Sequence, residues 1–306
     1  MMLQVLADGL IVGSVISLGA IGLTITFSIL RFSNFGHGEL LAWGAYVALS
    51  AVGWFAALAG NGARAFQPFS FGWPLVLALM AAMACAAAIA LALDWLLFKR
   101  LRTQGSITLV IASFGAALAM RNLLFFFYGG IPQYYGSDLQ IAVALLPRSF
   151  WGGLRVTPDQ IFVLALTVVT VTVLHLFLSR STLGRAMRAT ANNPQLARVS
   201  GIDPERVLRA TWTIGAMLAG LAGVFAGLTV QLRPTMGLDL LLPLFAAAIL
   251  GGIGSVWGAV IGGLIVGLAE SAAVMWIGAE YRSAAAFAVL IAILLVRPTG
   301  LFAEKT

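Results

Sequence analysis

The sequence predicts an all-α protein, a polytopic transmembrane helical bundle with about eight or nine membrane segments. Of its 306 residues, 61% are hydrophobic and only 9% are charged, whereas a soluble domain carries about 25% charged residues. Apolar runs without charge recur along nearly the whole chain, and a membrane-spanning helix needs about 20 mostly apolar residues. Each run is expected to be helical, because backbone in lipid must satisfy its own hydrogen bonds.

The predicted membrane segments follow these apolar runs in chain order. The first, near 9–30, is expected to be retained, because the first positive charge is Arg31 and a cleaved signal peptide would carry a basic flank. The later segments are placed by length and hydrophobic pattern. They lie near 38–58, 74–97, 105–128, 159–178, 211–231, 241–276 and 284–296.

The region 241–276 needs a separate argument. Its 36 residues are too many for one simple crossing, and the run from Gly251 to Ser255 is a turn signal. A single crossing would leave the C-terminus outside, whereas two crossings or a fold-back would leave it inside. Arg297 favours the second arrangement, with an outer N-terminus and an inner C-terminus.

The basic residues indicate orientation rather than a nucleic-acid partner. The net charge is +7, but a nucleic-acid binder would carry its cations on an exposed face beside residues that read bases. Here the cations gather in short gaps between apolar runs, the pattern of loops held on the cytoplasmic side. This places the loop 129–157 outside. The two clusters are Lys99, Arg100 and Arg102, and Arg180, Arg185, Arg188, Arg198, Arg206 and Arg209.

The most unusual short stretch separates the first two apolar runs and combines polar, ionisable and flexible residues. Ser33 or Asn34 could cap the next helix, with Glu39 in its first turn. The alternative is a broken helix or re-entrant turn that lines a transport path. No metal site is expected, because no second histidine or cysteine cluster accompanies the stretch. The candidate path residues are Ser33, Asn34, Gly36, His37, Gly38 and Glu39.

Charged and small residues inside the apolar runs raise two further questions. Arg121 and Glu270 are costly there unless they are paired or face water, so each marks a functional site or belongs to an interhelical ion pair. Gly254, Gly258 and Gly262 follow the four-residue spacing that lets helices approach closely. Close packing is the simpler interpretation of these glycines, and a pore-lining role is the alternative.

The segment 179–210 is expected to form a docking loop on the cytoplasmic side. Thr182 could cap a first short helix that runs through Ala191. Asn193, followed by proline, then starts a second helix of roughly seven residues, which ends at Gly201. Connections between helices of a bundle usually have about 2 to 8 residues. This segment is longer and contains a capped helix, which indicates contact with a partner protein. A solvated basic loop is the alternative.

The chain offers no site for ATP. Its lysines are Lys99 and Lys305, and neither ends a phosphate-binding loop of the G-x-x-x-x-G-K-[ST] type. The chain is therefore not expected to be an enzyme or to hold a cofactor, and ATP would be used by partner subunits.

Four stretches of the sequence form a recognisable combination: 34–39, 183–189, 201–203 and 250–255. Together they resemble the permease subunits of high-affinity branched-chain amino acid ABC transporters, of the LivH type. The likeness runs from about Gly9 to Leu301. The importers' docking motif, E-A-A-x-x-x-G, is matched only at Ala197 and Gly201.

This resemblance implies one permease domain over 1–306 that forms half of a translocation path in a bacterial inner membrane. Its partners would be the lipid bilayer, a second homologous permease subunit, two cytoplasmic ATPase subunits and a soluble substrate-binding protein. The implied docking residues are Gly184, Arg185, Arg188, Ala189, Leu196, Ala197, Gly201 and Ile202.

The substrate stays open at this point. Family members often carry alanine where Gly36 stands and lysine where Pro243 stands, so a contact made by that lysine does not carry over. The same permease fold serves importers of urea and short-chain amides, and the two permeases of one complex are either identical or different. A stand-alone secondary transporter would carry paired acidic or histidine residues along its helices, and this chain shows only isolated candidates.

Overall fold

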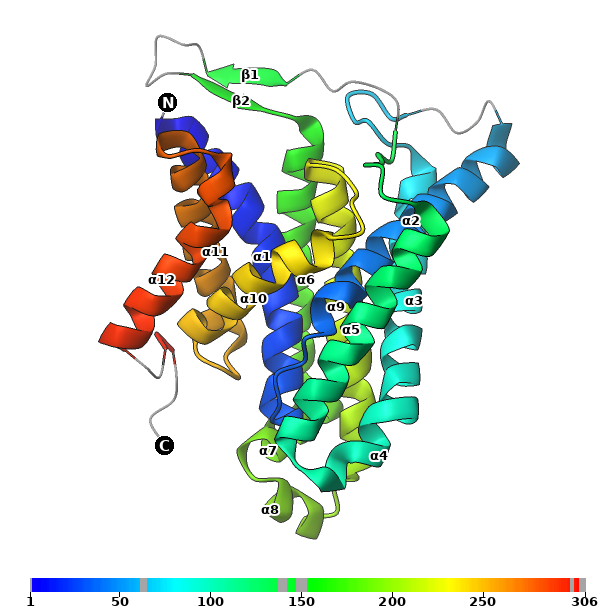
Figure 1. Ribbon diagram of the computed structural model, residues 1–306, viewed down its shortest axis with the longest axis vertical. Coiled ribbons are helices and arrows are strands. Elements are labelled where there is room, and N and C mark those ends of the chain that lie inside the picture. Colours follow the sequence, from blue (N-terminus) through cyan, green and yellow to red (C-terminus); the bar gives the residue numbers. More distant parts are fainter. Residues whose placement is uncertain (1, 61–64, 137–141, 147–152, 298–299, 303–306) are drawn as a thin grey trace.

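Helices make up almost all of the molecule (Figure 1). The computed structural model describes residues 2–60, 65–136, 142–146, 153–297 and 300–302. In this part of the chain, eight helices are long and apolar enough to cross a membrane, which confirms the predicted polytopic bundle. The helices are α1 (Met2–Leu30), α2 (His37–Ala59), α3 (Trp73–Leu93), α4 (Lys99–Leu101), α5 (Ser106–Tyr128), α6 (Pro158–Arg180), α7 (Thr182–Asn192), α8 (Pro194–Val199), α9 (Pro204–Thr229), α10 (Met236–Gly251), α11 (Val256–Trp276) and α12 (Arg282–Val296).

Helices α1 and α9 form the centre of the bundle and are its most buried long helices. They pack against each other, and α1 also lies along α11. A Cβ added at Gly13 would lie 2.8 Å from the Cα of Leu264, and one added at Gly267 would overlap the backbone of Gly13. Small residues therefore set the close distance between α1 and α11, as is common where membrane helices cross.

The region predicted at 241–276 is two helices, α10 and α11, which pack side by side. Gly252 and Gly254, with φ of 93° and 94°, form the turn between them. Gly262 lies so close to α10 that an added Cβ would overlap the carbonyl oxygen of Ala247, and Gly258 approaches Gly251 in the same way. The predicted interruption at the run from Gly251 to Ser255 is confirmed, because this run separates the two helices.

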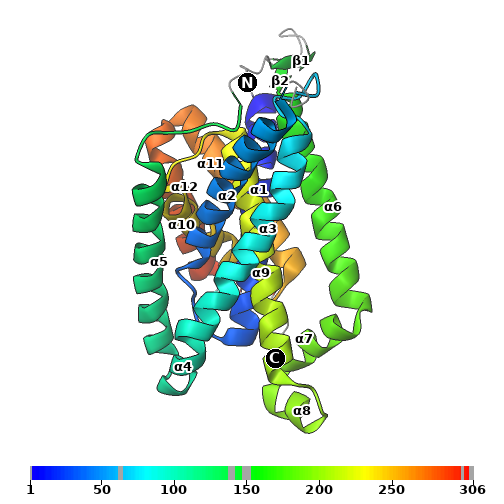
Figure 2. The same cartoon turned by 90° about the vertical axis from the view of Figure 1, so that its right-hand side faces the viewer.

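Both basic clusters lie at the same end of the bundle. Lys99 and Arg100 belong to α4. The arginines of the second cluster lie on α7 and α8, at the end of α6 or in the first turns of α9. Helices α4, α7 and α8 sit together at the lower end in both views (Figures 1 and 2). The N-terminus and the two strands β1 (Val143–Leu146) and β2 (Leu154–Val156) lie at the opposite end. The charge distribution is therefore polarised along the long axis of the bundle.

The strands at the upper end were not predicted, since the sequence indicated only a loop over 129–157. They pair antiparallel, with Val143 opposite Val156. Residues 137–141 and 147–152 of this loop lie outside the described part. Nearby, the hydroxyl of Tyr135 donates to the carbonyl of Ala45 over 2.9 Å. Burial raises the pKa of this hydroxyl well above its usual value, with a smaller effect from a neighbouring phenol, so it keeps the proton that it donates.

Candidate functional site

The turn between α1 and α2 is held by hydrogen bonds of its own backbone and side chains. Arg31 has a left-handed backbone with φ of 56°, and the Asn34 carboxamide oxygen accepts from the Gly36 N–H at 3.0 Å. Gly36 is the residue before α2, and no side chain caps the helix there. The expectation that Ser33 or Asn34 caps α2 is therefore wrong, because the Asn34 side chain is engaged two residues on, inside the turn.

His37 fastens the start of α2 to α1. Its side chain is buried, with 1% of the residue exposed, and its Nε2 lies 3.0 Å from the carbonyl oxygen of Gly19. Gly22 leaves room for the ring, since a Cβ there would lie 3.0 Å from the imidazole. Among the described residues, no group of three potential metal ligands is present, so the geometry assigns His37 an interhelical contact.

Glu39 and Arg121 form an ion pair between α2 and α5. The Nε and Nη2 of Arg121 donate to Glu39 Oε1 over 3.0 and 2.7 Å, and the two side chains are 15% and 2% exposed. Glu39 Oε2 is buried and has no hydrogen-bond partner in the described part of the chain. The same two helices are also joined by the Trp43 indole, which donates to the Met120 carbonyl over 3.1 Å.

The first turns of α2 and α10 meet directly. A Cβ added at Gly38 would overlap the carbonyl of Gly237, and one at Gly237 would approach the carbonyl of Gly38. Only glycine at both positions permits this approach. Asp239, also in the first turn of α10, is exposed and accepts a hydrogen bond from Thr235 Oγ1 over 3.3 Å. Two helices therefore begin beside one another, each with an acidic residue in its first turn.

Glu270 forms a second ion pair, with Arg282 of α12. Arg282 Nε donates to Glu270 Oε2 over 3.0 Å, and the Glu270 side chain is 2% exposed. Each of the two charged residues that the sequence placed in apolar runs is thus half of an interhelical ion pair. Their partners lie 82 and 12 positions away in the sequence, so the sequence around each charged residue did not identify its partner.

The segment α7–α8 has three side-chain caps. Ser181 Oγ accepts from the Gly184 N–H over 2.9 Å, so the cap of α7 is one residue before the predicted Thr182. Asn193 Oδ1 accepts from two N–H groups at the start of α8, each over 3.0 Å, and Asp203 caps α9. These last two caps are as predicted, because each is a short acceptor followed by proline.

Helix α8 presents apolar side chains outward. Leu196 is 64% exposed and Val199 is 87% exposed, whereas Ala197 is 5% exposed and lies on the inner side. The helix has six residues and ends at Val199, and Gly201, whose φ is 82°, follows its cap residue Ser200. At the other end of the segment, Gly184 lies against the last turn of α6, where a Cβ would overlap the carbonyl of Leu178.

The remaining predicted docking residues occupy different places in this segment. Arg188 Nη1 donates to the carbonyl of Leu178, and Arg185 Nη1 donates to that of Arg180 over 3.4 Å. Both arginines are exposed but turned back toward α6. Ala189 is exposed, and Ile202 is half-buried. The outer surface of α8 is therefore more open to a partner than the basic face of α7.

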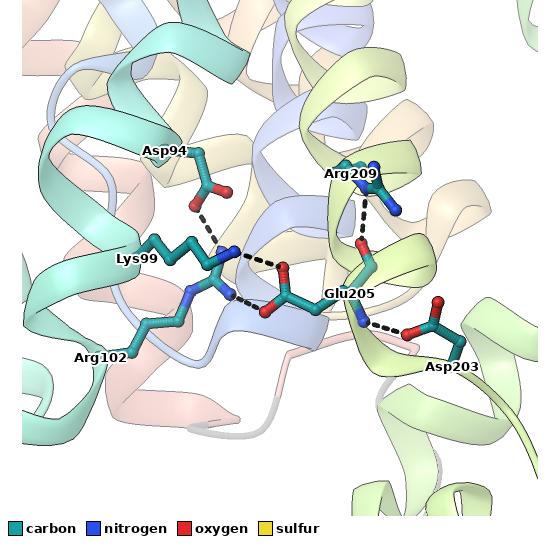
Figure 3. Close-up of polar contacts among 6 residues, drawn as sticks. All are labelled: Asp94, Lys99, Arg102, Asp203, Glu205 and Arg209. Atoms are coloured by element: carbon teal, nitrogen blue, oxygen red, sulfur yellow. Dashed lines mark hydrogen bonds and ion pairs between the residues drawn. The ribbon is translucent and has the colours of Figure 1, made fainter.

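Ion pairs fasten the start of α9 to α4 (Figure 3). Arg102 bridges Asp94 and Glu205, with Nη2 at 2.5 Å from Asp94 Oδ1 and Nη1 at 3.1 Å from Glu205 Oε1. Lys99 Nζ lies 3.5 Å from Glu205 Oε2. Asp94 is buried in a π-helical turn, Asp94–Phe98, at the end of α3. Local sequence patterns did not predict this network, although Asp94, a lone acid inside the apolar run 74–97, was a signal for it.

A second fastening lies on the other side of α8. Arg31 Nη2 donates to the carbonyl of Ala191 in the last turns of α7, over 3.2 Å. Because Arg31 directly follows α1, this bond joins α7 to the turn before α2. The ion pairs of Glu205 join the start of α9, which follows α8 in the chain, to α4. One hydrogen bond therefore connects the segment α7–α8 to the residues that lead into the polar turn.

These features define a class of protein: a multi-pass membrane bundle in which two helices begin side by side and a short capped helix lies exposed at one end. The family model described as "Branched-chain amino acid transport system / permease component" matches residues 5–294. The chain belongs to this family of transporter permeases, which are not an enzyme class. As a permease of an ABC transporter family, it works with ATPase and binding-protein partners.

Curated relatives match over nearly the whole length. The chain is 32% identical to the high-affinity branched-chain amino acid transport system permease protein BraD of Pseudomonas aeruginosa, over 98% of this chain and 95% of that protein. It is equally identical to LivH of Escherichia coli K12, over 98% and 94%. A probable LivH of Methanocaldococcus jannaschii is 27% identical, over 97% and 91%.

Proposed function

We propose that the chain is a permease subunit of an ATP-driven importer of branched-chain amino acids in the bacterial cytoplasmic membrane. The full-length similarity to BraD and LivH, whose names give this substrate class, supports the substrate. The observation that carries the ATP-driven part is α8, with exposed Leu196 and Val199 at the end of the bundle that holds both basic clusters. This end is cytoplasmic by the distribution of positive charge.

The proposed complex contains one more homologous permease subunit, two ATPase subunits and a soluble binding protein. ATP is bound by the ATPase subunits, and this chain uses no cofactor. Residues 1–306 act as one permease domain, in which 179–210 docks the ATPase. Closure of the ATPase pair would move α8, and the contacts from Arg31 to Ala191 and from Arg102 to Glu205 would carry the motion into the bundle.

The proposed translocation path passes the turn before α2. Irregular backbone at membrane depth is tolerated where it is buried in protein or lines a cavity, and interrupted helices commonly form transporter binding sites. Asn34, His37 and Glu39 are buried in this turn or at its end, and they contact α1 and α5. Movement of either helix would therefore change the shape of the turn.

Reconstitution tests this function. The chain, its cognate second permease, both ATPase subunits and the binding protein are placed in liposomes, and uptake of radiolabelled leucine is measured with and without ATP. We expect uptake that needs ATP, the binding protein and this chain. Uptake of urea or acetamide without uptake of leucine, isoleucine or valine would contradict the proposed substrate class.

A further inference from the structure

The carboxylate of Glu39 has one oxygen that its own ion pair does not use. Both contacts from Arg121 reach Oε1, whereas Oε2 is buried and has no hydrogen-bond partner among the described residues. Glu39 is 1% exposed. A buried acceptor without a donor is unfavourable, and most buried polar atoms in proteins are paired. The unused oxygen therefore indicates a place for a donor that the chain itself does not supply.

This oxygen lies within a set of charged groups at membrane depth. Arg121 is seven residues before the end of α5, about 10 Å along the helix. Asp239 is exposed in the first turn of α10, whose start meets the start of α2, the helix that carries Glu39. Charged side chains at such a depth face a water-filled cavity or another subunit rather than lipid. Helices α2, α5 and α10 thus each contribute one charged residue, beside the rings of Phe35, Phe114 and Phe245.

The helix starts add positive potential at the same place. Helices α2 and α10 begin side by side at Gly38 and Gly237, and neither Gly36 nor Thr235 provides a side-chain cap. The N-terminal end of a helix favours a carboxylate, and interrupted transporter helices use it for this purpose. Acceptors for an ammonium group therefore lie next to donors for a carboxylate group.

We propose that Glu39, Arg121 and Asp239 form a subsite for the charged head of an α-amino acid. Glu39 Oε2, with Asp239, accepts the hydrogen bonds of the substrate ammonium group. Arg121 and the first turns of α2 and α10 bind the substrate carboxylate. The substrate zwitterion carries one charge of each sign. Binding therefore replaces the ion pair between Glu39 and Arg121 with two ion pairs, one to the substrate ammonium group and one to its carboxylate. This inference rests on the proposed import function and deepens it, because a neutral amide would not need two opposite charges.

Glu270 provides a matched comparison within the same chain. It is buried to the same degree, is paired with an arginine, and also has one oxygen without a hydrogen-bond partner in the described residues. Its pair joins α11 to α12 and does not lie at the contact between the starts of α2 and α10. An unused oxygen alone is therefore insufficient for the assignment, which depends on the meeting of two helix starts and a second acid.

The test exchanges the charges of each pair. The double variant Glu39→Arg with Arg121→Glu keeps an ion pair between α2 and α5 but reverses its direction. We expect it to assemble and to keep ATP hydrolysis stimulated by the loaded binding protein, while leucine uptake falls roughly tenfold or more, since each lost charge-assisted bond is worth about one factor of ten or more. The matched exchange, Glu270→Arg with Arg282→Glu, should keep uptake near the wild-type rate.

Wild-type uptake by the Glu39 and Arg121 exchange would show that this pair is only structural and would overturn the subsite. If the variant with exchanged charges does not assemble, Glu39→Asp tests the same proposal. Aspartate keeps the negative charge, but its side chain is one methylene shorter, so the unused oxygen lies farther from the substrate. Wild-type uptake by Glu39→Asp overturns the proposal, and reduced uptake with normal assembly supports it. Failure of the wild-type complex to import leucine would instead overturn the import function itself.

Discussion

The polar turn before α2 and the helix α8 place their side chains in opposite ways. At the turn, His37 and Glu39 are each 1% exposed and bind other helices. On α8, Leu196 and Val199 are 64% and 87% exposed and contact nothing that would bury them. Polar groups buried with partners fix one internal geometry, whereas apolar groups left exposed mark an interaction surface. This contrast supports the proposal that the first region lines the interior path and that the second serves assembly.

The largest expected effect is at the contact between α2 and α10. Gly38→Leu places a side chain where even a Cβ would overlap the Gly237 carbonyl, so the two helix starts must separate. Overpacking of this kind costs about 1–3 kcal/mol or more. We expect loss of uptake together with a lower yield and a lower Tm of the detergent-solubilised protein, measured by thermal aggregation.

Gly53→Leu is the control for this change, because Gly53 lies in the same helix and a Cβ there meets no atom within 4 Å. It should leave the Tm nearly unchanged. Equal losses in both variants would show that α2 is sensitive to any added bulk, and the special role of the contact with α10 would be lost.

The next effect concerns the outer face of α8. Val199→Asp puts a charge at the most exposed apolar side chain of the helix. A charge in an apolar interface is strongly unfavourable, so we expect roughly tenfold or more weaker association with the ATPase subunits. The Tm of the isolated permease should not change. Co-purification with the ATPase subunits measures the effect, and Ser200→Asp at the exposed end of the same helix is the control.

A smaller effect is expected at the end of α8. Gly201 has φ of 82°, and an added Cβ there meets no atom within 4 Å, so only backbone strain opposes a substitution. Gly201→Val should cost about 1 kcal/mol locally and reduce stimulation of ATP hydrolysis. Gly201→Asn should recover most of it, since asparagine tolerates this conformation. Equal activity of the valine and asparagine variants would argue against a role for this turn.

Local signals explain what the sequence predicted well. The helices followed apolar runs, and the break between α10 and α11 followed a glycine cluster. The caps at Asn193 and Asp203 followed from a short acceptor before proline. Each of these features depends on residues within a few positions of one another, so the pattern alone contains the information.

The candidate site was less accessible from the sequence, because its contacts are long-range. Glu39 was identified as a candidate, but its partner Arg121 lies 82 positions away. The contact between Gly38 and Gly237 joins two helix starts from opposite halves of the chain. Asn34 was expected to act as a cap and instead closes its own turn. Such pairings depend on how helices pack, which composition and spacing do not specify.

The smallest expected effect is a change in Tm, which should differ between exposed and buried residues of the ion-pair network in Figure 3. Lys99 and Glu205 are 55% and 47% exposed, and exposed ion pairs contribute about 0–1 kcal/mol, less at high salt. Lys99→Gln should therefore change the Tm little, and any change should vanish in high salt. Arg102→Gln should lower the Tm at every salt concentration, because it leaves the Asp94 carboxylate, 8% exposed, without its partner and an uncompensated buried charge is strongly destabilising. Thermal aggregation of both variants at low and high salt measures this difference. Equal, salt-sensitive losses would mean that the network is solvated throughout and that it adds little to the stability of the contact between α4 and α9.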